Sequence, residues 1–209
     1  ETATAALLHH LDSLDDPTAR GASLLPGWSV GHVLTHICRN ADGMSQLVDW
    51  ALTGVPRPMY TSMEARESDI AAGSSRSAAD LRADVAASAG RLATRLADLA
   101  AARDECRNRL VLLGAPPPGT VPDMPAHEIP VRRLREVLVH HVDLGLPGYG
   151  PEDWPDSFVT WTLAWLDHKN GPAPVTGEPH EVLAWRLGRG AGLSVRATDG
   201  GDPGVPPAW

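Results

Sequence analysis

The stretch LREVLVHHVD, residues 134–143, is the part of this chain that decides its fold. It fits one helix that begins near Pro130 and ends at Gly145. Glu136 and His140 stand four residues apart, so a helix puts both side chains on one face with Cβ atoms about 5–6 Å apart. A carboxylate and an imidazole on one helix face make half of a metal site, and a second helix is needed to complete it.

A second stretch, GWSVGHVLTHI at residues 27–37, carries His32 and His36 at the same spacing. Two neighbouring helices that present ligands inward are a common way to hold a metal in a bundle. Glu136, His140 and one histidine of this pair would supply two imidazoles and a carboxylate, which is a ligand set known for catalytic zinc. Either pair alone can arise by chance, and the metal hypothesis depends on both. Val33 excludes the H-E-x-x-H metalloprotease motif, which needs glutamate there.

Composition limits the partners of this chain. Its 209 residues suffice for a main domain and a small annex, and 43% hydrophobic with 21% charged residues is typical of a globular protein. The net charge of -8 argues against nucleic acid or an anionic membrane as partner. Without a spanning apolar run or a signal-peptide pattern, we expect a cytoplasmic protein. Cys38 and Cys106, the two cysteines, do not suggest a disulfide scaffold or an all-cysteine zinc site.

Apolar periodicity, capping residues and breakers predict the order of the elements. Helices are expected at residues 2–14, 30–52, 78–103, 130–144, 155–167 and 181–187, with an extended proline-rich segment at 116–130 and a strand at 193–197. Residues 59–75 give only a weak, partly helical signal. The glycines and prolines of residues 145–155 indicate a linker, so we expect a helical domain over residues 1–150 and a small α/β domain over residues 151–209.

Three motifs match a known family in the same order along nearly the whole chain. They are LPGWSVGHVLTHICRNADG at residues 25–43, REVLVHHVDLG at 135–145 and VLAWRLGR at 182–189, and the chain also ends in Pro-Ala-Trp. Together they resemble mycothiol-dependent maleylpyruvate isomerases of the DinB-like, metal-binding superfamily. The resemblance implies a mainly α fold, namely a DinB-like four-helix bundle followed by a small α/β C-terminal domain.

The same resemblance implies roles for individual residues. His36, Glu136 and His140 become the ligands of one zinc ion. His32 lies one turn earlier, as a supporting or packing residue near the cofactor. His141 and Asp143 match the second motif and are also assigned to the cofactor site.

The third motif implies a catalytic residue. Arg189 matches a C-terminal arginine that the family uses near the active site. Arg186, by contrast, stands where an apolar residue is usual.

The implied chemistry uses an external thiol, mycothiol. Coordination to zinc turns a thiol into a thiolate, which adds to the cis double bond of maleylpyruvate, allows rotation and is eliminated to give fumarylpyruvate. Arg189 would hold a substrate carboxylate or the enolate oxygen. Because mycothiol is a neutral sugar conjugate, aromatic faces suit it, and Trp28 is our candidate, with Trp50 and Trp154 as further ones.

Two other functions stay open. A zinc-dependent mycothiol S-transferase would attach the same thiolate to an electrophilic metabolite, drug or toxin. A non-catalytic bundle would only bind a ligand. The residues also leave open the physiological electrophile, the thiol, the choice between zinc and nickel, cobalt or iron, and whether the protein is a monomer or a homodimer.

Overall fold

The computed structural model describes residues 2–114, 117, 119–189 and 194–205. The chain divides into two compact units, residues 1–145 and 146–209, and the division falls at the start of the predicted linker. Both units are mainly helical, with short strand pairs. Among the described residues, no helix has the length and apolar character that crossing a membrane requires.

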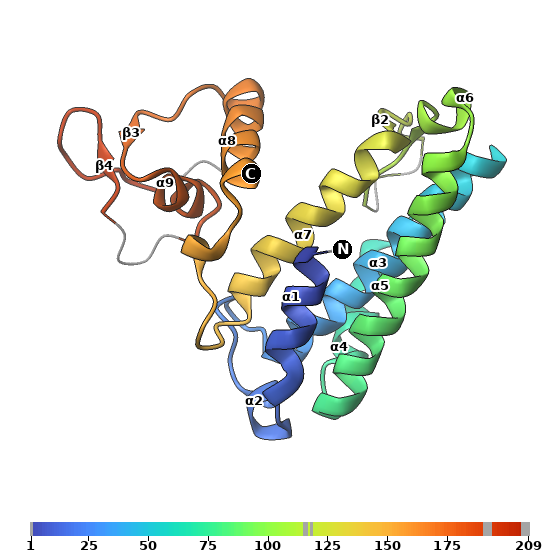
Figure 1. Cartoon of the computed structure of the whole chain (residues 1–209), viewed down its shortest axis with the longest axis horizontal. Helices are drawn as coiled ribbons and strands as arrows, with labels where there is room; N and C mark the ends of the chain where they lie inside the picture. Colours follow the sequence, from blue (N-terminus) through green and yellow to red (C-terminus); the bar gives the residue numbers. More distant parts are fainter. Residues whose placement is uncertain (1, 115–116, 118, 190–193, 206–209) are drawn as a thin grey trace. The chain divides into compact units, whose positions relative to one another are not determined.

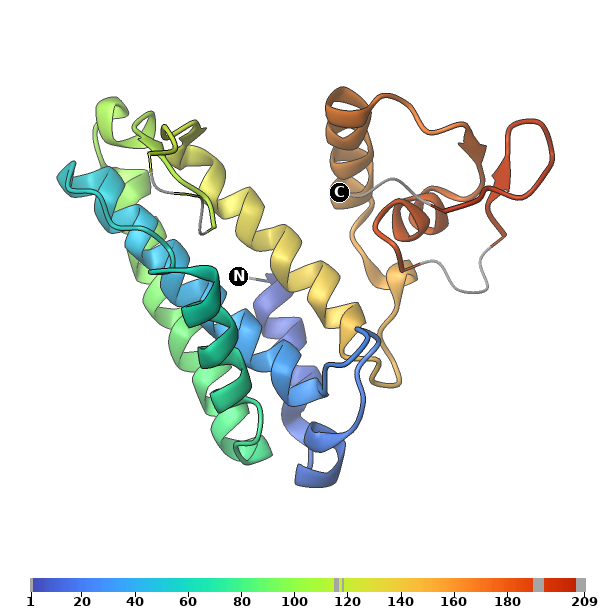
Figure 2. The same cartoon turned by 180° about the vertical axis from the view of Figure 1, so that it is seen from behind.

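Four helices of the first unit form a bundle (Figure 1). They are α1 (Thr2–His10), α3 (Val30–Thr53), α5 (Ala78–Ala101) and α7 (Ile129–Asp143). α3 packs against α5 and α7, and α1 packs against α7 and α5. A further helix, α4 (Met63–Gly73), lies along α3 (Figure 2).

Shorter elements join these helices. They are η1 (Leu11–Ser13), α2 (Asp16–Arg20), α6 (Asp104–Arg107), η2 (Ala126–Glu128) and the antiparallel strands β1 (Leu110–Val111) and β2 (Met124–Pro125). The β1–β2 pair closes one end of the bundle core, where Val111 and Met124 are buried beside Ile129.

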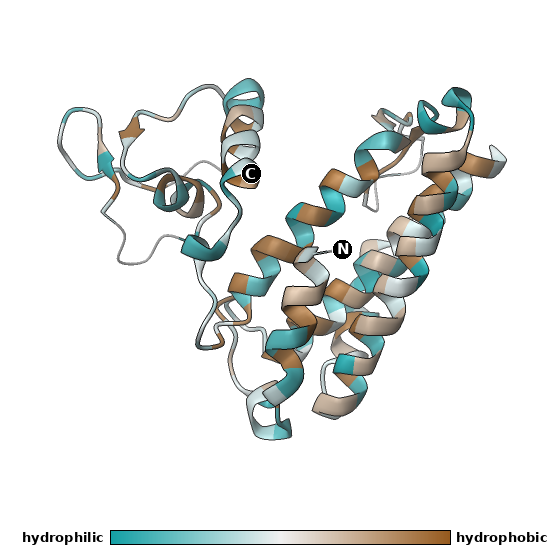
Figure 3. Ribbon diagram, viewed as in Figure 1, coloured by the Kyte–Doolittle hydropathy of each residue, from teal (hydrophilic) through white to brown (hydrophobic). Residues whose placement is uncertain are grey.

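The two long central helices follow their sequence signals. The Ser29 side chain accepts a hydrogen bond from the His32 N–H and caps α3, and Gly54 ends α3 with φ 78°. Ser77 caps α5 in the same way. The apolar positions predicted for α3 are all buried, namely Val30, Val33, Leu34, Ile37 and Ala41. Hydrophobic and hydrophilic residues alternate along α5, as its one-sided burial requires (Figure 3).

Three segments differ from the prediction. The helix expected at residues 2–14 ends at His10, and a separate helix, α2, follows because Asp15 caps it and Pro17 fits its first turn. The weak segment at 59–75 contains a complete helix, α4, capped by Ser62. The proline-rich segment is not wholly extended, since η2 and the first two residues of α7 lie within it.

The described part of the second unit contains two α-helices, one short 3₁₀ helix and one strand pair. These are α8 (Asp156–Asn170), α9 (Pro179–Arg186), the short η3 (Pro151–Asp153) and the antiparallel strands β3 (Val175–Thr176) and β4 (Arg196–Ala197). Trp154 and Phe158 pack edge to face in its core, with ring centroids 5.9 Å apart. Leu193 of the predicted strand and the closing residues 207–209 lie outside the described residues.

The structure explains why Arg186 departs from the usual apolar residue. Its side chain is buried, forms an ion pair with Asp167 and donates a hydrogen bond to the Gly171 carbonyl. A buried charge is tolerated when it is paired and hydrogen-bonded, so Arg186 ties α9 to the end of α8.

Two glycines test the packing of the bundle. A Cβ on Gly31 in α3 would lie 2.1 Å from the backbone oxygen of Ser74, whereas a Cβ on Gly90 in α5 would meet no atom within 4 Å. Gly31→Ala should therefore lower the free energy of unfolding by about 1–3 kcal/mol. Gly90→Ala should raise it by about 0.5–1 kcal/mol, because alanine is the better helix former. Urea denaturation measures both changes, and a tolerated Gly31→Ala would contradict the close approach.

Candidate metal centre

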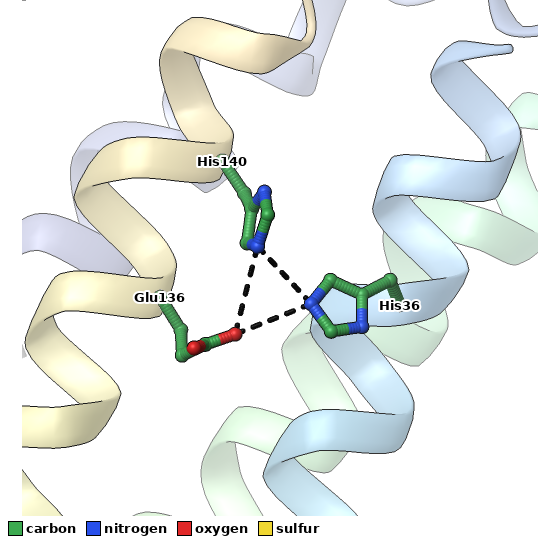
Figure 4. Close-up of side chains that lie close together, drawn as sticks. All are labelled: His36, Glu136 and His140. Carbon is green, nitrogen blue, oxygen red and sulfur yellow. Dashed lines mark hydrogen bonds and ion pairs between the residues drawn. The ribbon is translucent and has the colours of Figure 1, made fainter. Parts of the chain in front are cut away.

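The side chains of His36, Glu136 and His140 converge between α3 and α7 (Figure 4). His36 Nε2 lies 3.2 Å from Glu136 Oε2 and 3.1 Å from His140 Nε2, and His140 Nε2 lies 3.6 Å from the same carboxylate oxygen. His36 is 5% exposed. Sequence reasoning left His32 and His36 open until the family resemblance favoured His36, and it is His36 that lies beside the α7 pair.

Electrostatics couples the three groups. Burial lowers the pKa of His36, and the positive charges of His140 and Arg66 act in the same direction. Burial would raise the pKa of Glu136, but hydrogen bonds from His140 and His36 outweigh it, and the pKa lies well below its usual range. Burial opposes the charged form of His140, but hydrogen bonds with Asp143 and Glu136 raise its pKa. The carboxylate is thus ionised and one imidazole readily carries a proton.

Asp143 orients one of the imidazoles. Its side chain is fully buried, and its Oδ2 lies 2.7 Å from His140 Nδ1. A carboxylate that accepts the Nδ1 proton leaves Nε2 with a lone pair, as metal-binding histidines commonly require. Asp143 was assigned to the cofactor site from its motif, and this hydrogen bond shows how it can act there through His140.

A second buried contact holds the two ligand-bearing helices together. Arg133 of α7 donates hydrogen bonds of 2.9 Å to the Ile37 carbonyl and to Asn40 Oδ1, both on α3. Because Arg133 precedes Glu136 by almost one turn, this contact fixes the register of α7 against α3.

The remaining assigned residues of the first unit have different surroundings. Trp28 is half-buried, with its ring 5.8 Å from the His36 ring in an edge-on arrangement. His32 belongs to the cap of α3, where its Nδ1 accepts from the Ser29 N–H. His141 is buried and its Nε2 lies 2.8 Å from Nδ1 of His10 on α1. His32 and His141 are not among the residues that line the pocket described below, whereas Trp28 is. The assignment of His32 and His141 to the cofactor site stays a prediction.

The three candidate ligands line a pocket of about 340 Å³. Its other lining residues are Leu25, Trp28, Asn40, Met44, Met59, Tyr60, Arg66, Leu113, Gly114, Arg132 and Arg135. Trp50, by contrast, belongs to the hydrophobic core, and Trp154 to the core of the second unit. The arginines and Tyr60 were missed from the sequence. Arg132 precedes Glu136 by one helical turn and could have been found from the spacing, whereas Arg135 is the neighbour of Glu136 in sequence and Arg66 comes from the segment with the weak signal.

Arg189 lies in the second unit, directly after α9. Its backbone N–H donates to the Ala184 carbonyl, and its Nη1 donates to the Leu187 carbonyl at 2.5 Å. These contacts cap the C-terminal end of α9. The role of Arg189 at the active site stays a prediction.

Comparison with known families extends these observations. Residues 1–145 match the model of the mycothiol maleylpyruvate isomerase N-terminal domain. The chain belongs to this family. It is similar to the crystal structures of a mycothiol-dependent maleylpyruvate isomerase and of a histidine-to-alanine mutant of that isomerase, each with 26% identity and a TM-score of 0.84 over 100% of this chain and 93% of the other. A comparison with curated proteins finds no match.

Membership of the mycothiol maleylpyruvate isomerase family confirms the resemblance seen in the motifs. The structural similarity confirms the expected mainly α fold, a four-helix bundle followed by a small α/β domain. The isomerase neighbours also indicate that the chain is an enzyme.

Asp143→Asn tests the orientation of His140. The amide keeps the shape of the side chain but can turn its NH₂ toward Nδ1, which disfavours the tautomer with a free Nε2. Zinc affinity should fall by about 10–100-fold, as measured by competition with a chromogenic chelator. Asp49→Asn is the control, because Asp49 pairs with Arg57 and Arg95 outside the pocket. Equal zinc affinity of Asp143→Asn and wild type would contradict the orienting role.

The raised pKa of His140 predicts a proton release on metal binding. Zinc must displace the proton that His140 holds to a higher pH than a free imidazole does. Apparent zinc affinity should therefore rise with pH through the neutral range and level off above the pKa of His140. Calorimetry in buffers of different ionisation enthalpy measures the released proton, and a binding enthalpy independent of buffer would show that His140 is not protonated in the metal-free protein.

Proposed function

We propose that this chain is a mycothiol- and zinc-dependent cis–trans isomerase that converts maleylpyruvate into fumarylpyruvate in the cytoplasm. The observation that carries the proposal is the convergence of His36, Glu136 and His140 on one wall of a pocket. Family membership and the similar solved isomerase support the thiol and the substrate.

The donor set suits zinc. Two imidazole nitrogens and one carboxylate oxygen are an established ligand set for catalytic zinc, which keeps a fourth position for water or substrate. The candidate ligand atoms lie within 4.8 Å of one another, and they border the pocket. Asp143 supports His140 in the way that buried carboxylates support zinc ligands elsewhere.

The nucleophile must come from outside the chain. Zinc in this site would lower the pKa of a coordinating thiol so that it is a thiolate near neutral pH. The protein's own cysteines do not suit this role, because Cys38 is fully buried with its pKa raised by burial to about 12, and Cys106 is also buried. An external thiol such as mycothiol is therefore required.

The pocket residues have roles in binding and in excluding water. Trp28 supplies an aromatic face beside His36, and such faces suit sugar rings. Met44, Met59 and Leu113 make part of the wall apolar. An apolar wall beside the reacting atoms limits access of water, which would otherwise protonate the enolate before the thiolate is eliminated.

Metal content and turnover test the proposal together. Wild-type protein should contain about one zinc per chain and isomerise maleylpyruvate only with mycothiol present. His36→Ala and Glu136→Ala should lose both the metal and the activity. His9→Ala is the matched control, since His9 is exposed, pairs with Asp12 outside the pocket and should change neither quantity.

Other outcomes would favour the alternatives. Zinc-dependent conjugation of mycothiol to a bimane electrophile without isomerisation of maleylpyruvate would identify an S-transferase. Loss of zinc that changes only the unfolding temperature, with no thiol-dependent turnover, would identify a non-catalytic bundle. A metal-free wild-type protein would remove the zinc mechanism.

A further inference from the structure

The pocket wall is positively charged in a chain that is acidic overall. Arg66, Arg132 and Arg135 line the pocket together with the candidate metal ligands, and Glu136 is the one carboxylate among the lining residues that the structure describes. The whole chain, by contrast, carries a net charge of -8. Zinc would add further positive charge, so the pocket has an excess of cations that an anion can neutralise.

The three arginines differ in their surroundings. Arg132 forms an ion pair with Glu128 at 2.7 Å. Arg135 is buried, and burial lowers its pKa. Arg66, on α4, is half-buried with its Cζ 5.7 Å from the centre of the Tyr60 ring. Within the part of the chain that the structure describes, no carboxylate forms an ion pair with Arg66.

The contact between Arg66 and His36 points to a missing partner. Arg66 Nη2 lies 3.0 Å from His36 Nδ1, so the guanidinium can donate only while Nδ1 has a lone pair. His36 Nε2 faces Glu136 and His140. A neutral imidazole that gives its Nε2 lone pair to a metal carries its proton on Nδ1. In the metal-binding state, Arg66 Nη2 therefore loses this acceptor. The Tyr60 hydroxyl stays beside the guanidinium, but a guanidinium has five N–H donors and can bind a further acceptor.

Apart from its sulfur, which would bind the zinc, mycothiol is neutral and offers no anionic acceptor, but the electrophile does. Maleylpyruvate carries carboxylates, and a guanidinium binds a carboxylate through two parallel hydrogen bonds. We propose that Arg66 binds a carboxylate of the electrophile and makes the pocket selective for anionic electrophiles. Arg132 and Arg135 add positive potential in the same pocket. This inference deepens the proposed function and rests on its metal ligands, but it does not depend on the isomerisation itself.

Binding without the thiol isolates this role from turnover. The probes are maleate and its uncharged diamide, maleamide, which share the cis double bond, titrated by calorimetry into zinc-loaded protein. Wild type should bind maleate more tightly than maleamide. Arg66→Gln should weaken maleate binding by about 10–100-fold, because a charge-assisted pair is lost, and should leave maleamide unchanged. Arg103→Gln is the control, since Arg103 is exposed and outside the pocket.

Zinc content separates substrate binding from support of His36. Arg66→Gln should retain zinc, and Arg66→Lys, which keeps the charge but not the planar fork, should show an intermediate loss of maleate affinity. If Arg66→Gln does not retain zinc, the maleate affinity of zinc-loaded Arg66→Lys is compared with that of wild type instead. Equal maleate affinity in wild type and the zinc-loaded Arg66 variant, or equal affinity of wild type for maleate and maleamide, would overturn the inference.

The outcomes also distinguish this inference from the proposed function. Arg66-dependent maleate binding in a protein that does not isomerise maleylpyruvate would support the role of Arg66 and contradict the proposed isomerase function. Isomerisation by a protein whose maleate affinity is independent of Arg66 would support the isomerase function and contradict the role of Arg66.

Discussion

Two imidazoles and a carboxylate meet between α3 and α7, and the carboxylate depends on the other two. A buried carboxylate without a partner costs several kcal/mol. His36 and His140 both lie within hydrogen-bond or ion-pair distance of Glu136, His140 can supply the compensating positive charge, and Asp143 in turn holds His140. The packing of the bundle must keep these atoms together, which explains the buried Arg133 bridge between α7 and α3.

Much of the bundle could be predicted because its signals are local. Ser29 and Ser77 begin their helices through hydrogen bonds within one turn, and the apolar stripe of α3 follows from the helical repeat alone. The pairing of two of the candidate ligands was predictable for the same reason, since Glu136 and His140 share one helix face. Choosing His36 over His32 needed the family resemblance, because both histidines have the same spacing.

Other features depend on contacts that spacing does not encode. α4 has few buried residues, so its sequence lacks a strong apolar period, and Arg66 could not be assigned to the pocket. The separate α2 was missed because a single cap, Asp15, outweighs the continuity of the preceding helix. His141 matched a motif, yet it contacts His10 on α1, a helix distant in sequence.

The candidate ligands are far apart in sequence, so a bound metal would also stabilise the folded chain. His36 and Glu136 are separated by 100 residues, and they meet only when α3 and α7 are packed together. An ion shared by them would act as a reversible cross-link that closes a long loop. Loops of this length lose much conformational entropy on closure, and an ion that binds only the folded chain shifts the folding equilibrium by mass action. The supply of metal would then set the lifetime of the protein as well as its chemistry.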